Sequence, residues 1–151
     1  MSRVILYIVN LPMHIHLWVY GIYIQDDKVL MIKKSRWPYT WMYDLPGGGI
    51  EYGETIEVAL ARELDEEVWA TLTSSTYIWN NEYIAPYISA TTGLEKMFHH
   101  IWIYYTVDLV IESLKTEPDW HDSLGAVWVN VSDLSAENVS PIALPMILQV
   151  V

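Results

Sequence analysis

One stretch constrains this chain more than any other. It runs from Gly47 to Ala70 and reads GGGIEYGETIEVALARELDEEVWA. Three glycines open it, and seven carboxylates then follow against a single basic residue, Arg62. Like charges one turn apart on an exposed helix repel by roughly 0.2–0.5 kcal/mol per pair. A segment this acidic therefore needs a partner that compensates its charge.

The second half of the stretch is predicted to form a helix over Thr55 to Val68. Thr55 is a suitable N-cap, and Glu57 lies in the first turn, where the helix dipole favours an acid. The apolar residues share one side of the helical wheel, which we expect to face a core. These residues are Ile56, Leu60, Leu64 and Val68.

One flank of that apolar side gathers Glu63, Glu66 and Glu67. We expect these three carboxylates to converge on a hard divalent cation such as Mg²⁺, which accepts carboxylate oxygens and keeps waters that phosphates can displace. Gly47, Gly48 and Gly49 let the backbone approach a ligand closely, so this loop can deliver a carbonyl to the metal. Taken alone, an acidic helix flank is more often just a solvated face, and three consecutive glycines are more often just a turn.

The stretch resembles the signature of the Nudix hydrolases, G-x5-E-x7-R-E-U-x-E-E-x-G-U, in which U is aliphatic. The glycine Gly48 and the isolated acid Glu54 stand at its first two fixed positions. The remaining matches are Arg62, Glu63, Leu64, Glu66, Glu67 and Ala70. Trp69 stands where the family has glycine. Because Trp adopts a positive φ only at a cost of about 1 kcal/mol or more, we expect the helix to end in another geometry, with the indole packed against its end.

The resemblance implies an α/β fold, a Nudix-type α/β/α sandwich with a central mixed sheet. It also implies hydrolysis of a diphosphate bond in a nucleoside diphosphate joined to another group, with Mg²⁺ or Mn²⁺ as cofactor. The implied metal ligands are the Gly47 carbonyl, Glu63, Glu66 and Glu67. Arg62 would position Glu63, and Glu54 would support the site. The general base stays open between Glu63 and a downstream acid, Asp122 or Glu117.

Substrate contacts are expected just before the glycine loop, where basic residues gather in an otherwise acidic chain. We assign Lys34, Arg36 and Gly48 to substrate binding; the alternative is that these cations serve solubility at a strand end. Trp37, Tyr39, Trp41 and Tyr43 also crowd this loop, and any of them could stack on a ring or pack in the core.

Among the histidines, only His121 beside Asp122 is a candidate for the site. Subfamily patterns leave the substrate open, because Pro86 favours ADP-ribose and the adjacent Tyr87 favours dinucleoside polyphosphates.

Composition limits the partners. The net charge is −11 with only 8 Lys and Arg, so duplex nucleic acid and anionic membrane surfaces are unfavourable partners. We expect a small nucleotide-type substrate, a cytoplasmic location and one domain over 1–151, and the sequence leaves a homodimer open.

The same fold also carries two other functions. A binding or sensor domain without turnover is disfavoured by the intact acids, and an isomerase of the isopentenyl diphosphate type is disfavoured because the chain has no cysteine.

Elsewhere, the alternation of apolar and polar residues predicts mostly strands. Strands are expected over Val4 to Val9, Leu17 to Gln25, Val29 to Lys34, Met97 to Val110 and Ala126 to Val131. Asp26-Asp27 reads as a hairpin turn. Thr71 to Ile88 is strand-like with an interruption at Asn80-Asn81, and Pro141 to Val150 is predicted to form a short closing helix.

Overall fold

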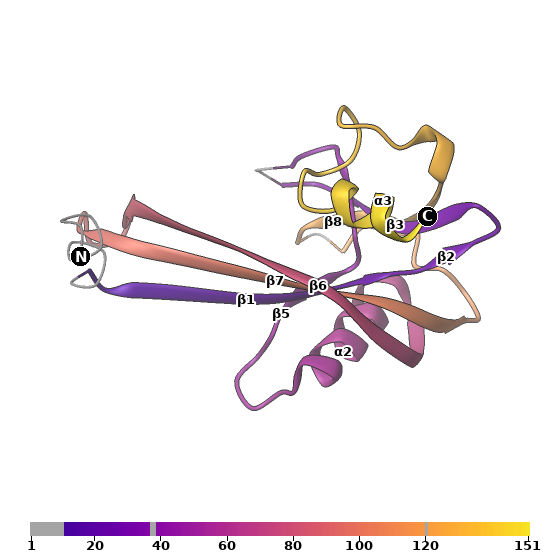
Figure 1. Ribbon diagram of the computed structural model, residues 1–151, viewed down its shortest axis with the longest axis horizontal. Coiled ribbons are helices and arrows are strands. Elements are labelled where there is room, and N and C mark those ends of the chain that lie inside the picture. Colours follow the sequence, from indigo (N-terminus) through magenta and orange to yellow (C-terminus); the bar gives the residue numbers. More distant parts are fainter. Residues whose placement is uncertain (1–10, 37–38, 120) are drawn as a thin grey trace.

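A computed structural model describes residues 11–36, 39–119 and 121–151, and shows two sheets held between two helices (Figure 1). In this view helix α2 (Ile56–Val68) lies below the strands and helix α3 (Leu144–Val150) lies above them. The arrangement confirms the predicted α/β/α sandwich. The strand predicted over Val4 to Val9 lies outside the described residues.

The first sheet has the strand order β5-β1-β7-β6 and carries the glycine loop at one edge. Strand β1 (Met13–Ile22) runs parallel to β7 (Glu95–Ile111) and antiparallel to the short β5 (Gly47–Gly49). Strand β6 (Ala70–Ile88) runs antiparallel to β7 and forms the other edge. The sheet is therefore mixed, as predicted.

The second sheet is antiparallel and is built around β3 (Lys28–Lys34). Its other strands are β2 (Ile24–Gln25), β4 (Tyr43–Asp44) and β8 (Ser123–Asn130), which is followed by a 3₁₀ turn over Val131–Asp133. Asp26 and Asp27 both have positive φ, 50° and 59°, as the two central residues of a type I′ hairpin turn do. This confirms the hairpin predicted from the Asp-Asp pair.

Strand residues alternate between two cores because successive side chains point to opposite faces. Val19, Leu30 and Ile32 pack with the apolar side of α2, through Leu60, Leu64 and Val68. Their neighbours Tyr20, Val29 and Met31 pack on the other face with Ile147 of α3. The two cores hold the acidic helix and the glycine edge in a fixed relation.

Strands β6 and β7 form a long hairpin that extends beyond the body of the molecule alongside β1 (Figure 1). The interruption predicted at Asn80-Asn81 is wrong, because these residues pair with Ile103 and Trp102 within one continuous strand. The irregularities of register lie instead between Leu72 and Ser74 and between Tyr77 and Trp79. Among the described residues, no helix is long and apolar enough to cross a membrane.

Candidate active site

The glycine loop is narrow because it lies directly against β1 and α2. A Cβ atom on Gly47 would collide with the Val19 carbonyl oxygen and lie 2.8 Å from the Cα atom of Tyr20, and Gly47 has a φ of 150°. A Cβ atom on Gly48 would lie 2.5–2.7 Å from the Glu63 carboxylate. Position 47 therefore requires glycine, whereas a side chain at position 48 would push the Glu63 carboxylate out of its place.

Helix α2 begins at a conventional N-cap. The Thr55 hydroxyl accepts a hydrogen bond from the Val58 amide at 3.2 Å, as the sequence predicts. The buried residues Ala59, Leu60, Leu64 and Val68 fix the rotation of the helix. Its acidic flank consequently faces the glycine loop.

Arg62 joins the loop to the helix through five hydrogen bonds. Its guanidinium donates to both Glu54 oxygens at 2.7 and 3.0 Å and to the Gly49 carbonyl at 2.9 Å. It also donates to Glu63 at 2.9 Å and to Glu66 at 3.3 Å. The bond from Arg62 holds the pKa of Glu54 at about 2, helped by the Glu51 amide. The contact expected between Arg62 and Glu63 is thus present, and the same guanidinium also binds Glu54.

The three helix carboxylates differ in their surroundings. Glu67 accepts a hydrogen bond from the Gly47 amide at 2.8 Å, and burial raises its pKa well above the usual range. Burial also raises the pKa of Glu63, and the neighbouring Glu66 charge adds to the rise. Glu66 is exposed. The charged forms of Glu63 and Glu67 are therefore disfavoured by burial, although Glu63 is paired with Arg62.

The expected convergence of three carboxylates on one point is not found. In the described part of the chain, no three acidic or histidine side chains are grouped as metal ligands. The reason is visible in their hydrogen bonds, since Arg62 draws Glu63 and Glu66 toward itself while Glu67 turns to the Gly47 amide. The donors are nevertheless hard oxygens on one helix flank, which is the chemistry that Mg²⁺ requires.

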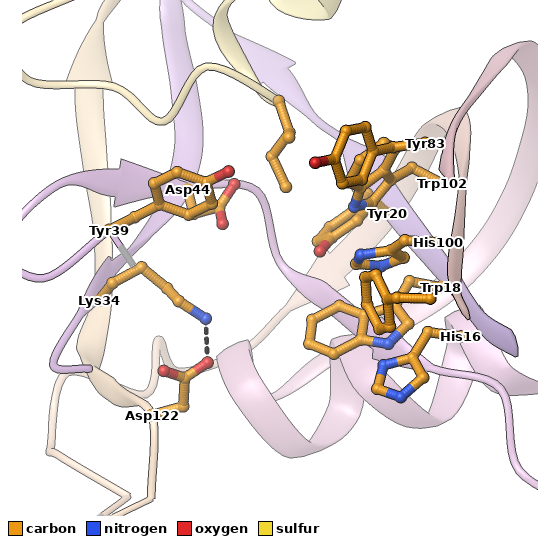
Figure 2. A pocket seen from close by; sticks show the side chains of 12 residues that line it. His16, Trp18, Tyr20, Lys34, Tyr39, Asp44, Tyr83, His100, Trp102 and Asp122 are labelled. Carbon is orange, nitrogen blue, oxygen red and sulfur yellow. Dashed lines mark hydrogen bonds and ion pairs between the residues drawn. The ribbon is translucent and has the colours of Figure 1, made fainter. Parts of the chain in front are cut away.

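A cavity of about 590 Å³ opens between the two sheets on the α3 side (Figure 2). One wall is aromatic and comes from alternate positions of β1 and β7. The parallel register pairs His16 with His100 and Trp18 with Trp102, so all four lie on one face. The aromatic residues of this wall are His16, Trp18, Tyr20, Phe98, His100 and Trp102.

The opposite wall is polar and carries Lys34, Tyr39, Asp44 and Asp122. The Lys34 ammonium forms an ion pair with the Asp122 carboxylate. Asp119 holds the loop of Asp122, because its carboxylate accepts hydrogen bonds from the amides of His121, Asp122 and Ser123 at 2.8–3.1 Å. Two residues separated by 88 positions are thereby brought together.

The other predicted site residues lie elsewhere. Arg36 is exposed and does not line the cavity, and Glu117 is exposed as well. Of the loop aromatics, Tyr39 lines the cavity, Trp41 is 68% exposed, and Trp37 falls outside the described residues. The sequence analysis missed Asp44 and the aromatic wall. The wall had a signal, since His16, Trp18 and Tyr20 recur at every second position, as do Phe98, His100 and Trp102.

Trp69 corrects the expectation for the end of α2. It adopts the left-handed conformation that glycine would take, with φ 59° and ψ 41°, and its amide donates to the carbonyls of Asp65 and Leu64. The indole is 51% exposed rather than packed against the helix end. The family geometry is therefore kept at the expense of backbone strain.

Comparison with known proteins agrees with this fold. The sequence matches the NUDIX domain family over residues 15–150. It is 44% identical over 58 residues to an ADP-ribose pyrophosphatase of Methanocaldococcus jannaschii, a match that covers 38% of this chain and 34% of that protein. The chain thus aligns with about a third of that relative's length.

Two solved structures resemble the whole fold. The crystal structure of a MutT NUDIX hydrolase from Burkholderia pseudomallei matches with a TM-score of 0.69 and 23% identity, covering 91% of this chain and 99% of the other. The NUDIX domain of Shewanella oneidensis NrtR, complexed with ADP ribose, matches with a TM-score of 0.66 and 18% identity, covering 99% and 97%.

In this α/β/α sandwich, an arginine joins the glycine loop to an acidic helix. These features define a class of hydrolases whose members typically act with a divalent cation. The chain belongs to the Nudix hydrolase family.

Proposed function

We propose that this protein hydrolyses the diphosphate bond of a nucleoside diphosphate joined to another group, with Mg²⁺ or Mn²⁺ as cofactor. One observation carries the proposal. Glu67 of the acidic helix accepts a hydrogen bond from the Gly47 amide, and Gly47 pairs across the sheet with Tyr20, which lines the aromatic cavity. The acidic flank and the cavity therefore lie on neighbouring residues, which suits a ligand with a phosphate group at one end and a ring at the other.

The cation would be held by Glu63, Glu66, Glu67 and the Gly47 carbonyl. When bound, it neutralises charge on the bridging phosphate oxygens and lowers the pKa of the attacking water. Arg62 keeps Glu63 in place and ties it to the loop through Gly49. Gly48 lets Glu63 approach the loop, because any side chain at position 48 would displace the carboxylate.

We assign the general base to Glu63 rather than Asp122. Asp122 is paired with the Lys34 ammonium on the polar wall of the cavity, whereas Glu63 stands on the helix flank that would hold the cation. Within the described residues Glu63 accepts its hydrogen bond from Arg62 through Oε1, which leaves Oε2 for water. Lys34 supplies positive charge beside the substrate phosphates, while Arg36 would contact a phosphate only from outside the cavity.

ADP-ribose is the substrate to test first. The similarity to an ADP-ribose pyrophosphatase covers 58 residues, and the NrtR domain with a similar fold was crystallised with ADP ribose. Purified protein with Mg²⁺ should be assayed against ADP-ribose, nucleoside triphosphates, dinucleoside polyphosphates and nucleotide sugars. Release of AMP and ribose 5-phosphate from ADP-ribose is the expected result.

The variant Glu67→Gln should lower turnover by at least about 10²-fold, because it removes a charged metal ligand. The amide still accepts the Gly47 hydrogen bond, so the protein should remain folded. Asp108→Asn, an exposed acid on β7, is the matched control and should keep the wild-type rate. Wild-type turnover by Glu67→Gln would refute the assignment of the metal site.

A binding domain without turnover is the second candidate. It is favoured by the pairing of Glu63 and Glu66 with Arg62, which leaves no preformed group of three metal ligands in the described ranges. The two candidates separate when ADP-ribose binding and hydrolysis are measured on one sample. Tight binding without AMP release in Mg²⁺ and in Mn²⁺ would favour the binding domain.

A further inference from the structure

Asp44 stands out as a buried acid inside the cavity. Only 2% of its surface is exposed, and burial raises its pKa to about 6 although Ser140 and Lys34 oppose the rise. A carboxylate without compensation in such a place is costly. Asp44 also lies three residues before Gly47, and only Leu45 and Pro46 separate it from the glycine loop.

The Asp44 carboxylate is fixed through one oxygen. Its Oδ1 accepts hydrogen bonds from the Leu45 amide at 2.9 Å and from the buried Ser140 hydroxyl at 2.8 Å. Among the described residues both hydrogen bonds use Oδ1, which leaves Oδ2 as an acceptor for a ligand. Figure 2 shows this carboxylate across the cavity from the aromatic wall.

The aromatic wall is a continuous and neutral stacking surface. The ring centroids of His100 and Trp102 are 4.3 Å apart with an interplanar angle of 37°, and those of Trp18 and His100 are 5.3 Å apart. Burial lowers the pKa of His100 to about 4, and the nearby His16 adds to the effect. His100 is therefore uncharged near neutral pH, and the wall offers π surfaces rather than a cation.

Two nitrogen atoms of the wall are free to form hydrogen bonds with a ligand. His100 Nε2 and Trp102 Nε1 are buried and have no hydrogen-bond partner among the described residues. A buried polar group without a partner is destabilising, so the wall is not packed to its own optimum. Asp44 and these rings line the same cavity.

We propose that Asp44 determines specificity by accepting a hydrogen bond from the exocyclic amino group of an adenine-type base stacked on the wall of Trp18, His100 and Trp102. The inference rests on the proposed function, since it places the nucleoside end of the substrate in the cavity. A base that stacks on one of these rings and extends across the cavity presents an edge to Asp44. Oδ2 of a charged carboxylate can accept hydrogen bonds but not donate them. A base with a carbonyl at the same position is disfavoured, because two acceptors then face each other.

The test compares two ligands that differ only in that group and that contain no diphosphate bond to hydrolyse. Binding of AMP, inosine 5′-monophosphate and ribose 5-phosphate is measured by calorimetry at pH 7.5. A hydrogen bond to a charged group predicts that AMP binds at least about tenfold more tightly than the inosine nucleotide. Ribose 5-phosphate, which has no ring to stack, should bind more weakly than either.

Asp44→Asn is the decisive variant, because an amide can both donate and accept. It should bring the two nucleotides within about twofold of each other, while Asp108→Asn keeps the wild-type ratio. Trp18→Leu should weaken both nucleotides and leave ribose 5-phosphate unchanged. A thermal melt of each variant shows that it is folded, and the wild-type ratio of the two ligands tests the proposal even if Asp44→Asn fails to fold.

Three results would overturn the proposal: equal affinity of wild type for both nucleotides, an unchanged ratio in Asp44→Asn, or ribose 5-phosphate binding as tightly as AMP. These outcomes are separate from the fate of the proposed function. Selective AMP binding without hydrolysis of ADP-ribose would leave Asp44 as the specificity residue of a binding domain. Hydrolysis of ADP-ribose without selectivity between the two nucleotides would support the proposed function and rule out this role of Asp44.

Discussion

The Arg62 guanidinium donates two hydrogen bonds to the Glu54 carboxylate, from Nε at 2.7 Å and from Nη2 at 3.0 Å. These bonds cross the turn that leads into α2. The same guanidinium reaches the Gly49 carbonyl and the Glu63 carboxylate. Because a planar fork satisfies all of these acceptors at once, a lysine cannot replace it. The glycine loop and the acidic flank of the helix are thus positioned by one side chain.

The first prediction concerns this clamp. Arg62→Lys keeps the charge but loses the two-point contact with Glu54, so turnover should fall roughly 10–100-fold, as is typical for residues that orient metal ligands. The measurement is steady-state hydrolysis at several Mg²⁺ concentrations. The control variant is Lys115→Arg, which exchanges one cation for another at a residue that donates to the backbone carbonyl of Glu66. Unchanged rates at every Mg²⁺ concentration would mean that Arg62 only stabilises the fold.

The second prediction links metal binding to stability. Glu63 and Glu67 repel each other electrostatically within the folded protein. Millimolar Mg²⁺ or Mn²⁺ should therefore raise the melting temperature, because a ligand that binds only the folded state stabilises it. The triple variant Glu63→Gln, Glu66→Gln, Glu67→Gln should lose this response. Equal shifts in both proteins would locate the binding elsewhere.

Local patterns in the sequence predicted much of the fold. The Asp26-Asp27 turn, the Thr55 N-cap and the apolar side of α2 each depend on neighbouring residues and are confirmed. Strand limits were less accurate. Strand β1 begins at Met13 rather than Leu17, since its start is set by the parallel pairing of Met13 with Met97, which lies far along the chain.

The site was predicted only where it is continuous in sequence. The signature from Gly48 to Glu67 identified the clamp, whereas the cavity depends on contacts between distant segments. Lys34 meets Asp122, and Ser140 meets Asp44, across 88 and 96 positions. Asp44 itself looked like an ordinary loop residue, because nothing in the sequence indicates that Ser140 lies behind it.

The third prediction concerns pH. The pKa of Asp44 rises from an ordinary value of 3.8 to about 6 in the folded protein, mainly through burial. The folded state therefore holds this proton more tightly than the unfolded state. The contribution of Asp44 to stability is most favourable below pH 4 and is lost as the pH rises through 6. About two pKa units correspond to roughly 3 kcal/mol.

Asp44→Asn does not titrate, so it provides the comparison. The free energy of unfolding of the variant minus that of the wild type should increase between pH 4 and pH 7, by up to roughly 3 kcal/mol. Urea denaturation at four pH values in this range measures it, and the other acids cancel in the difference. Parallel pH profiles for the two proteins would show that Asp44 is not a destabilised acid.

The last prediction concerns Trp69, whose φ of 59° holds an aromatic residue in the left-handed region. Glycine would relieve about 1–2 kcal/mol of backbone strain. The half-exposed indole contributes less than the roughly 2–3 kcal/mol of a fully buried large side chain, so Trp69→Gly should raise the melting temperature by about 2–4 °C. Trp69→Ala removes the same indole but keeps the strain, and it should show no gain. Turnover should change little in either variant, because α2 already ends in the geometry that glycine would give. A loss of stability in Trp69→Gly equal to that in Trp69→Ala would show that the indole contacts outweigh the strain.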